Sequence, residues 1–376
     1  MKVGVIGGGQ LGRMMALAGY PLGFSFRFLD PSHESPAGQV AERLSTPFDD
    51  PRSLDEFAQG LDLATYEFEN PPLTAAQRLA SRTPYFFPPV RALETVQDRL
   101  TQKNFFLSAG IATAPFDRVD SPRDLAQAVK TLGLPAVLKT RRMGYDGKGQ
   151  AVLREEKDLE KGWMALGASP LILEAFIPYS RELSLIAVRG RGGETAFYPL
   201  AENVHFEGIL RLSVAPAPDV AAALQQQAEE CARRVFAALD YVGVLAIEFF
   251  EHRQQLVANE MATRVHNSGH WTMDGAATSQ FENHLRAGAG LPLGPAAARG
   301  FTAMINLIGH QPASSEALAI PGAHLHLYGK SARPGRKLGH INLNEATRAE
   351  LTRAVELTRE LAGVWLPQNV QAAAED

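Results

Sequence analysis

The chain has 376 residues, of which 45% are hydrophobic and 21% are charged, and its formal net charge is -4. It is too long for one typical domain, and its composition is that of an ordinary globular enzyme. It has no basic block and no acidic tail, which argues against non-specific binding to nucleic acid or anionic lipid.

Cysteine content and hydropathy indicate the compartment. The single cysteine, Cys231, cannot form a disulfide within the chain, which suits a reducing cytoplasm. No run of about 18 apolar residues is present, so we expect no membrane span. The sequence therefore predicts a cytoplasmic protein, with Cys231 as a small buried residue of a helix rather than a nucleophile.

Residues 1–96 alternate between strand-like and helical patterns. The expected strands are KVGVIG, FSFRFLD and LDLATYEF, and the expected helices are QLGRMMALAGY, SLDEFAQG and PLTAAQRLA. This alternation predicts a parallel sheet with right-handed crossovers, hence a Rossmann-like N-terminal domain. The stretch YFFPP at 85–89 breaks the alternation and indicates a nearby domain boundary.

The turn after the first expected strand is rich in glycine. Gly7, Gly9 and Gly12 have the spacing G-x-G-x-x-G, and Asp30 ends the second apolar run. This combination matches the dinucleotide fingerprint, in which the acid binds a ribose hydroxyl. One interpretation is therefore an oxidoreductase with a nicotinamide or flavin cofactor. In the other, the glycines admit a different ligand, whose anionic group the helix N-terminus favours, and Asp30 only ends a strand.

Between residues 97 and 181 a second region begins. Its expected helices are DRLTQKNFFLSAG and SPRDLAQAVKTLG, and its expected strands are ATAPFDRV, LPAVLKT, AVLREE and LILEAFI. Lys139 ends a strand and precedes the glycine-rich loop RRMGYDGKGQ, whose Lys148 adds a second charge. Successive loop amides and two lysines suit a phosphate group. The alternative is a mobile hairpin loop with solvated charges.

From residue 182 the pattern becomes antiparallel. Expected strands are RELSLIAVRG, ETAFYPL, HFEGILRLSVA, VGVLAIEFF and QLVANE, with a long helix over 219–239. If the last turn centres near Gln254, Glu248 and Glu260 lie opposite each other on one face. Facing carboxylates between apolar strands need neutralisation, which predicts a Mg²⁺ site. The alternative is a solvated face with a salt bridge to Arg253 or Arg264.

Two further groups of polar residues point to ligands. The run of Arg264, His266, Asn267, Ser268 and His270 directly follows the carboxylate pair and suits a small oxyanion. Glu174 ends one strand and Glu182 begins the next, where an adenine edge and ribose hydroxyls are often held. A surface position is the equal alternative for either glutamate alone.

The C-terminal region, 296–376, contains expected strands FTAMINLIG, HLHLYGK and GHINL and the helix ATRAELTRAVELTRELAG. Its loop between residues 329 and 338 clusters four basic side chains, Lys330, Arg333, Arg336 and Lys337. In an acidic chain this cluster suits a substrate phosphate, and a solvated loop is the even alternative.

Together these stretches resemble the ATP-grasp superfamily, and within it the family of N5-carboxyaminoimidazole ribonucleotide synthetases. The resembling stretches are GGGQLGRM, TYEFEN, DRLTQK, GYDGKGQ, ENVHFEGIL, NEMATRVHNSGHWT and LYGKSARPGRKLGHI, which span nearly the whole chain. The resemblance implies a mixed α/β and α+β ATP-grasp fold. Its expected parts are a Rossmann-like domain at 1–96, a two-lobed ATP-grasp domain at 97–295 and a small C-terminal domain at 296–376.

The resemblance also implies an activity. Enzymes of this family are ligases of de novo purine biosynthesis, which use ATP and bicarbonate to carboxylate 5-aminoimidazole ribonucleotide through carboxyphosphate. The implied cofactors are ATP and Mg²⁺, the implied partners are these small substrates, and the implied assembly is a homodimer.

Site residues follow from the resembling motifs. The nucleotide is expected at Arg99, Lys139, Gly144, Tyr145, Asp146, Gly147, Lys148, Gly149, Glu174, Phe176, Ile177, Glu182, His205, Asn259 and Glu260. Mg²⁺ is expected at Glu248 and Glu260. The catalytic group is Arg264, His266, Asn267 and Lys330, the first three holding bicarbonate or carboxyphosphate. The aminoimidazole nucleotide is expected at Gln10, Leu11, Glu67, Glu69, Tyr145, Asp146, Lys330, Arg336 and Lys337.

The motifs depart from the family pattern after Glu260. Many ATP-grasp enzymes have E-x-N there, whereas this chain has Met261 and Ala262, which leaves the third metal ligand open. Thr263 replaces an expected proline. Two rival functions remain, an ATP-grasp ligase with another acceptor and the dinucleotide-dependent oxidoreductase.

Overall fold

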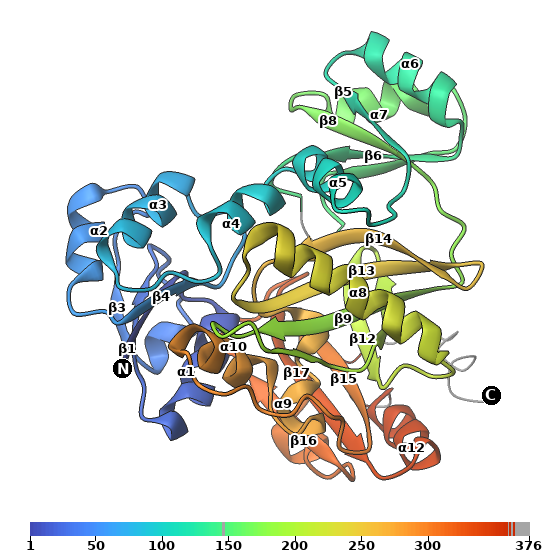
Figure 1. Ribbon diagram of the computed structural model, residues 1–376. Coiled ribbons are helices and arrows are strands. Elements are labelled where there is room, and N and C mark those ends of the chain that lie inside the picture. Colours follow the sequence, from blue (N-terminus) through green and yellow to red (C-terminus); the bar gives the residue numbers. More distant parts are fainter. Residues whose placement is uncertain (145–146, 360, 362–363, 365–376) are drawn as a thin grey trace.

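A computed structural model describes residues 1–144, 147–359, 361 and 364. Three sheets organise the chain: an N-terminal parallel sheet, a small antiparallel sheet and a large central sheet (Figure 1). The small sheet and its helices form a lobe that projects from the central sheet, at the top of Figure 1. No helix in the described part of the chain is long and apolar enough to cross a membrane.

The N-terminal sheet has the strand order β3-β2-β1-β4, and every pair in it is parallel. This confirms the expected βαβ pattern and adds the short strand β3, which has too few residues to show an alternating pattern. Phe86 of the YFFPP stretch forms a parallel bridge with Ala64, so this stretch extends the sheet edge. The elements are β1 (Lys2–Ile6), α1 (Gln10–Gly19), β2 (Ser25–Leu29), β3 (Glu42–Leu44), α2 (Pro51–Ala58), β4 (Leu63–Tyr66), α3 (Leu73–Arg82) and α4 (Val90–Val96).

The projecting lobe contains an antiparallel sheet with the order β5-β8-β6-β7. Helices α6 and α7 cover one face of it around a core that includes Leu125, Leu138 and Leu173. Ser121 caps α6 as expected, because its side chain accepts a hydrogen bond from the amide of Asp124. The elements are α5 (Arg99–Ser108), β5 (Phe116–Val119), α6 (Pro122–Leu132), β6 (Ala136–Thr140), β7 (Gln150–Leu153), α7 (Asp158–Leu166) and β8 (Leu171–Ala175).

The central sheet is antiparallel and has the order β14-β13-β9-β11-β12-β15-β17-β16, with β10 paired to β9. The expected single strand over 205–215 is wrong: Glu207, at a φ of 51°, and Gly208, at 74°, turn the chain between β11 and β12. The elements are β9 (Arg181–Arg189), β10 (Thr195–Phe197), β11 (Ala201–Phe206), β12 (Ile209–Ala215), α8 (Ala222–Leu239), β13 (Gly243–His252), β14 (Gln255–Ala262), α9 (Thr272–Gly275) and α10 (Gln280–Ala289).

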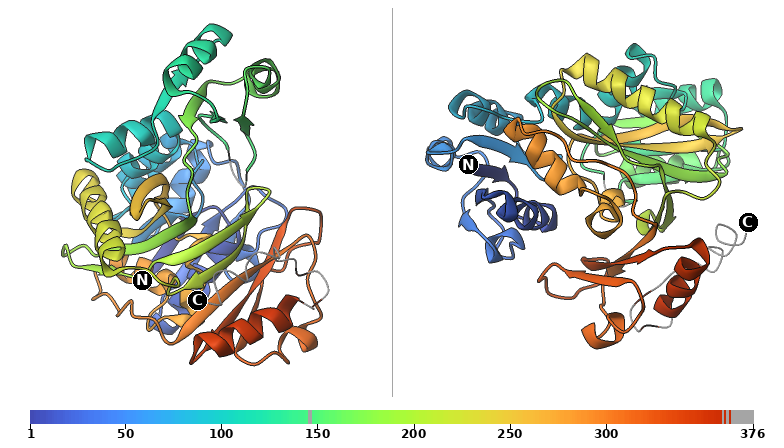
Figure 2. Two further views of the ribbon diagram at one scale, coloured as in Figure 1. Left: turned by 90° about the vertical axis from the view of Figure 1, so that its right-hand side faces the viewer. Right: turned by 60° about the horizontal axis from the view of Figure 1, so that its bottom comes forward.

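The C-terminal strands continue the central sheet rather than forming a sheet of their own. Strand β15 pairs with β12, and β17 pairs with β15, so segments far apart in sequence lie side by side (Figure 2). Helix α12 packs against β15 and β17. The elements are β15 (Phe301–Ile308), α11 (Ser314–Ala317), β16 (Ala323–Leu327), β17 (Lys337–Glu345) and α12 (Arg348–Arg359).

One hydrophobic core joins the N-terminal domain to the central sheet. Helix α10 packs on both α1 and β13, and the buried Phe281 and Leu285 of α10 lie in the same cluster as Met15 and Val244. His284 lies in this junction and contacts both sides. Its Nδ1 accepts from the amide of Val244, and its Nε2 donates to Thr65 Oγ1 at 2.9 Å. The N-terminal domain and the central sheet therefore share one hydrophobic core and are joined by the hydrogen bonds of His284.

Candidate active site

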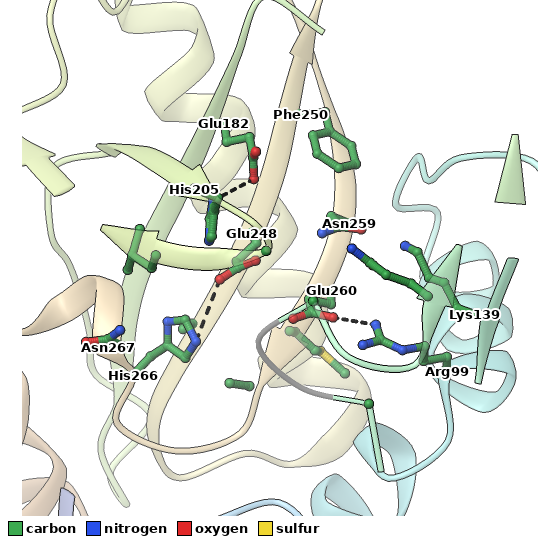
Figure 3. A pocket seen from close by; sticks show the side chains of 18 of the residues that line it. Arg99, Lys139, Glu182, His205, Glu248, Phe250, Asn259, Glu260, His266 and Asn267 are labelled. Atoms are coloured by element: carbon green, nitrogen blue, oxygen red, sulfur yellow. Dashed lines mark hydrogen bonds and ion pairs between the residues drawn. The ribbon is translucent and has the colours of Figure 1, made fainter. Parts of the chain in front are cut away.

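A cavity of about 560 Å³ lies where the three sheets meet, and it contains most of the predicted site residues (Figure 3). Side chains from the N-terminal domain, the projecting lobe and the central sheet all face it. The predicted residues that line it are Gln10, Leu11, Glu67, Glu69, Arg99, Lys139, Gly144, Gly147, Glu174, Phe176, Ile177, Glu182, His205, Glu248, Asn259, Glu260, Arg264, His266, Asn267 and Lys337.

Glu248 and Glu260 are cross-strand neighbours, as the turn position predicted. The two-residue turn at Arg253 and Gln254 has positive φ at both positions, as in a type I′ hairpin. An uninterrupted ladder from this turn would pair Glu248 with Asn259. A bulge leaves Asn259 without a cross-strand partner, so that Glu260 takes the position opposite Glu248.

The environments of the two carboxylates differ. Burial and repulsion by Glu260 raise the pKa of Glu248, whereas Arg99 overcomes burial and lowers the pKa of Glu260. Arg99 donates to Glu260 at 2.5 Å, so the partner is not Arg253 or Arg264. The side chain of Glu248 is 16% exposed and that of Glu260 is 38% exposed, both toward the cavity. When Glu248 is ionised, the pair carries one negative charge more than Arg99 neutralises, and both carboxylates are accessible to a cation from the cavity.

Glu174 is buried at one end of the cavity between two lysines. Lys139 and Lys103 lie 3.0 and 3.1 Å from the same oxygen, Oε2, while the buried Oε1 has no hydrogen-bond partner in the described part of the chain. Burial opposes ionisation, but the two lysines outweigh it and lower the pKa of Glu174 to about 2. The surface alternative for Glu174 is wrong. We did not predict Lys103 as a site residue, although it ends the resembling stretch DRLTQK, from which only Arg99 was selected.

Glu182 lies at the start of β9, facing the cavity, with partners on both oxygens. His205 Nδ1 from β11 is 3.1 Å from Oε2, and the Tyr179 hydroxyl donates to Oε1 at 3.2 Å. Burial disfavours charge on His205, yet Glu182 outweighs it and raises the histidine pKa. Phe250 pairs with Glu182 across the ladder between β13 and β9 and also lines the cavity. This end of the cavity thus combines a flat apolar surface with one carboxylate.

Arg264, His266 and Asn267 lie on the opposite side of the carboxylate pair. Arg264 makes an ion pair with Glu69 at 2.9 Å, and His266 Nε2 is 3.6 Å from Glu248 Oε1. Burial and the nearby Arg264 lower the pKa of His266 to about 3, so this ring is neutral near pH 7. Both polar atoms of the Asn267 side chain are buried and have no hydrogen-bond partner among residues 1–144, 147–359, 361 and 364. A small oxyanion would satisfy such groups.

His270, the last member of the predicted polar run, belongs elsewhere. Its ring is 1% exposed and packs 4.9 Å from His340 and 5.6 Å from Phe281, centroid to centroid. Burial lowers its pKa well below the usual value. His270 is therefore a neutral core residue, and the polar run divides between the cavity and the interior.

The glycine-rich turn does not leave an open anion site. Glu67 accepts from the amide of Gly9 at 2.5 Å and from that of Gly12 at 2.9 Å, so its carboxylate occupies the N-terminus of α1. A Cβ on Gly9 would lie 2.6 Å from this carboxylate. Asp30 accepts from the amide of Ser32, which identifies it as a turn residue. A dinucleotide pyrophosphate would have to displace a buried carboxylate, which argues against the oxidoreductase.

Four predicted residues do not line the cavity. Lys330 reaches its rim through Gln10, whose Oε1 accepts from Lys330 Nζ at 2.6 Å, and Arg336 pairs with Glu34. Lys148 and Gly149 follow the cavity-lining Gly147 in the loop. Tyr145 and Asp146 lie outside the described residues.

The carboxylate pair is the part of the cavity that offers ligands for a metal ion. Among residues 1–144, 147–359, 361 and 364, no three His, Cys, Asp or Glu side chains group as a metal site. Two carboxylates alone suit Mg²⁺, which usually keeps water and substrate phosphates as further ligands. Asn259 Oδ1 is buried beside them, and none of the described residues is its hydrogen-bond partner. The residues present therefore fit one Mg²⁺ ion bound together with a phosphate substrate.

Family models cover most of the chain in three consecutive parts. A ribonucleotide synthetase preATP-grasp domain matches residues 1–97, and an ATP-grasp domain matches residues 104–281. A phosphoribosylaminoimidazole carboxylase C-terminal domain matches residues 302–354. These matches confirm the predicted ATP-grasp fold with its N-terminal and C-terminal additions.

Individual relatives agree with these models. The chain is 51% identical to N5-carboxyaminoimidazole ribonucleotide synthase from Pseudomonas aeruginosa, over 93% of this chain and 96% of that one. The structure of N5-carboxyaminoimidazole ribonucleotide synthetase from Thermus thermophilus superposes with a TM-score of 0.94. Its sequence is 57% identical, and the match covers 98% of this chain and 100% of that one. The synthase from Aspergillus clavatus with ADP and 5-aminoimidazole ribonucleotide is 34% identical, with a TM-score of 0.86 and coverage of 95% and 98%. The chain therefore belongs to the N5-carboxyaminoimidazole ribonucleotide synthase family of ATP-grasp ligases.

Proposed function

We propose that this chain uses ATP and bicarbonate to carboxylate the exocyclic amine of 5-aminoimidazole ribonucleotide, releasing ADP and phosphate, in purine biosynthesis. The observation that carries the proposal is the carboxylate pair Glu248 and Glu260 between two oppositely equipped ends of one cavity. One end has lysines and an aromatic surface, as a nucleotide needs. The other end has Arg264 and Asn267, whose side-chain amide has no partner among the residues that the structure describes, as a small oxyanion needs.

ATP is assigned to the side of the cavity nearest the projecting lobe. Lys139 and Arg99 would neutralise its phosphates, and the loop amides around Gly147 would add donors. Phe176 and Ile177 offer an apolar surface for adenine, with Glu174 Oε1 as a free acceptor at its edge. Glu182 would accept from the ribose hydroxyls.

Mg²⁺ would be held by Glu248 and Glu260, with Asn259 Oδ1 as a candidate third oxygen in place of the missing E-x-N asparagine. When bound, such an ion neutralises charge on the transferring phosphoryl group. The protein's own contribution is the bulge at Asn259, which directs both carboxylates to the same side.

Bicarbonate is assigned to Arg264, His266 and Asn267. A bicarbonate oxygen attacks the γ-phosphorus of ATP, and ADP leaves with the bridging oxygen, which gives carboxyphosphate. The amine of the second substrate then attacks the carboxyl carbon, and phosphate leaves. The departing phosphate takes up the proton that the amine loses. His266, whose ring is neutral near pH 7, can exchange a hydrogen bond with the reacting group, while Arg264 stabilises negative charge.

The aminoimidazole nucleotide is assigned to the N-terminal side, near Gln10, Leu11, Glu67 and Glu69. Its phosphate would meet the basic side chains Lys330, Arg336 and Lys337 on the loop before β17. Burial lowers the pKa of Lys330 to about 8, and an anionic ligand would reverse this shift.

The proposed domains are residues 1–96, 97–295 and 296–376. The proposed assembly is a cytoplasmic homodimer.

The test is a coupled ADP-release assay. ADP release should require both bicarbonate and 5-aminoimidazole ribonucleotide, together with Mg²⁺. Turnover with formate and glycinamide ribonucleotide instead would assign the chain to another acceptor. Tight NADH binding without ATP turnover would instead indicate a dinucleotide-dependent oxidoreductase.

A further inference from the structure

The carboxylate of Glu182 is held from two sides before any nucleotide binds. His205 approaches Oε2 at 3.1 Å from strand β11, and the Tyr179 hydroxyl donates to Oε1 at 3.2 Å. Burial and the neighbouring Glu182 raise the pKa of Tyr179 to about 12, so its hydroxyl remains a donor. A carboxylate offers about four acceptor positions, which leaves two for groups in the cavity.

Tyr179 is itself fixed by the segment that connects the projecting lobe to the central sheet. Its ring stacks on Phe250 with centroids 4.6 Å apart and an angle of 15°. The adjacent Ser180 donates its amide to Glu251 O at 2.9 Å, and Pro178 O lies 2.7 Å from His252 Nδ1. The connecting segment is thus tied to the end of β13 on both sides of Tyr179.

We infer that Tyr179 is a positioning residue for Glu182, and that the two together set the preference for ribose over 2′-deoxyribose nucleotides. The inference rests on the proposed place of the ATP ribose at Glu182. The Tyr179 hydroxyl stops the carboxylate from rotating, so the free lone pairs point to both hydroxyls of a ribose. The Glu182 side chain is 22% exposed in the ligand-free protein, and a bound nucleotide would cover it. An analogue that lacks a hydroxyl would then leave a covered acceptor unpaired, which is how a site built to bind a hydroxyl discriminates.

The sequence alone gave no reason to select Tyr179, since a tyrosine after a proline in a connecting segment is ordinary. Its role depends on three elements that meet only in the fold. These are the connecting segment, β9 with Glu182, and β13 with Phe250, on whose ring Tyr179 stacks where both side chains line the cavity. The hydroxyl acts through Glu182 and is not itself assigned a contact with substrate.

The experiment is a cycle of two enzymes and two nucleotides. KM is measured for ATP and for 2′-deoxy-ATP with the unaltered protein and with Tyr179→Phe, which keeps the ring stacked on Phe250. Loss of one hydrogen bond should raise the KM for ATP by about 3- to 10-fold. The KM for 2′-deoxy-ATP should change by less than about twofold, so the preference for ribose falls by a similar factor. Tyr85→Phe is the matched control, because Tyr85 stacks on Phe87 away from the cavity.

Equal increases for both nucleotides, or an unchanged preference, would overturn the inference, since a merely structural role affects both alike. The same cycle is repeated with ADP and 2′-deoxy-ADP, with thermal stabilisation as the readout. This second measurement needs no aminoimidazole substrate. If carboxylation fails but the binding preference still depends on Tyr179, the proposed acceptor is wrong and the inference stands.

Discussion

Replacing Glu248 by glutamine should stabilise the ligand-free protein while abolishing turnover. Glutamine keeps the shape of the side chain beside His266, whose Nε2 lies 3.6 Å from Oε1. It removes the repulsion between residue 248 and Glu260. Arg99 keeps Glu260 as its carboxylate partner, so the substitution leaves no buried charge without an ion pair. The same change removes one of the two carboxylates assigned to Mg²⁺.

The gain in stability can be bounded from the geometry. Two charges about 5 Å apart repel by about 3 kcal/mol at an effective dielectric of about 20. Glu260 is paired with Arg99 and its side chain is 38% exposed, so screening reduces this value. We expect about 1–2 kcal/mol, which corresponds to a rise in Tm of about 1–3 °C for a chain of this size.

The gain should depend on pH with a definite sign. The pKa of Glu248 is raised in the folded protein, so the folded state holds this proton more tightly than the unfolded state does. The contribution is present below the unfolded pKa and is lost as pH rises through the folded value. Glu248→Gln should therefore match the unaltered protein near pH 4.5 and exceed it near pH 8.

The assay is thermal unfolding at both pH values, with and without Mg²⁺ and ADP, beside ADP release. Mg²⁺ should add to ADP stabilisation in the unaltered protein only, by up to about 2.7 kcal/mol at 100 times the Kd. Glu260→Gln is the contrasting variant, because it leaves Arg99 without its partner and should lower Tm as well as turnover. Retained turnover in Glu248→Gln, or a lower Tm at pH 8, would refute the reasoning.

Three further changes test other parts of the structure. Lys103→Met should destabilise the protein by about 1–3 kcal/mol in denaturant unfolding. It should also raise the KM for ATP more than that for the aminoimidazole nucleotide, because Lys139 alone must then neutralise Glu174; equal KM changes would contradict this. Gly9→Ala should displace Glu67, because the new Cβ would clash with its carboxylate, and should raise the KM for the aminoimidazole nucleotide but not for ATP. An unchanged ratio of the two KM values would show that the aminoimidazole nucleotide does not bind beside Glu67. Burial lowers the pKa of His284 to about 4, so stability should fall by about 2 kcal/mol between pH 7 and pH 5, and His284→Gln should reduce that slope.

The sequence predicted the local features of the site well. The carboxylate register followed from a turn placed near Gln254, and strand periodicity put Glu248 and Glu260 on one face. The bulge at Asn259 was not predictable, because an extra residue in a strand changes the alternation by only one position. The prediction of the pair was correct because the assumed turn centre made up for the missing bulge.

Contacts between distant segments were beyond the sequence. Arg99 meets Glu260 across 161 positions, and β12 pairs with β15 after an intervening helix, hairpin and junction. No local period encodes such pairings, so the sequence did not predict that the strands expected over 296–376 join the central sheet. The single strand expected over 205–215 failed for another reason, since a two-residue turn at Glu207 interrupts an otherwise continuous apolar alternation.

The glycine-rich turn explains how one motif can serve two chemistries. In a dinucleotide site the amides at the helix N-terminus remain free for a pyrophosphate. Here Glu67, at the end of the neighbouring strand β4, occupies the amides of Gly9 and Gly12. Burial raises the pKa of this carboxyl, and the two amides offset part of that shift. An internal carboxylate thus replaces the external phosphate, and the strand–turn–helix unit becomes a rigid wall that presents Gln10 and Leu11 to the cavity. Whether the turn binds an external phosphate therefore depends on the residue that occupies the helix N-terminus. The glycine spacing indicates only that the strand and the helix pack closely.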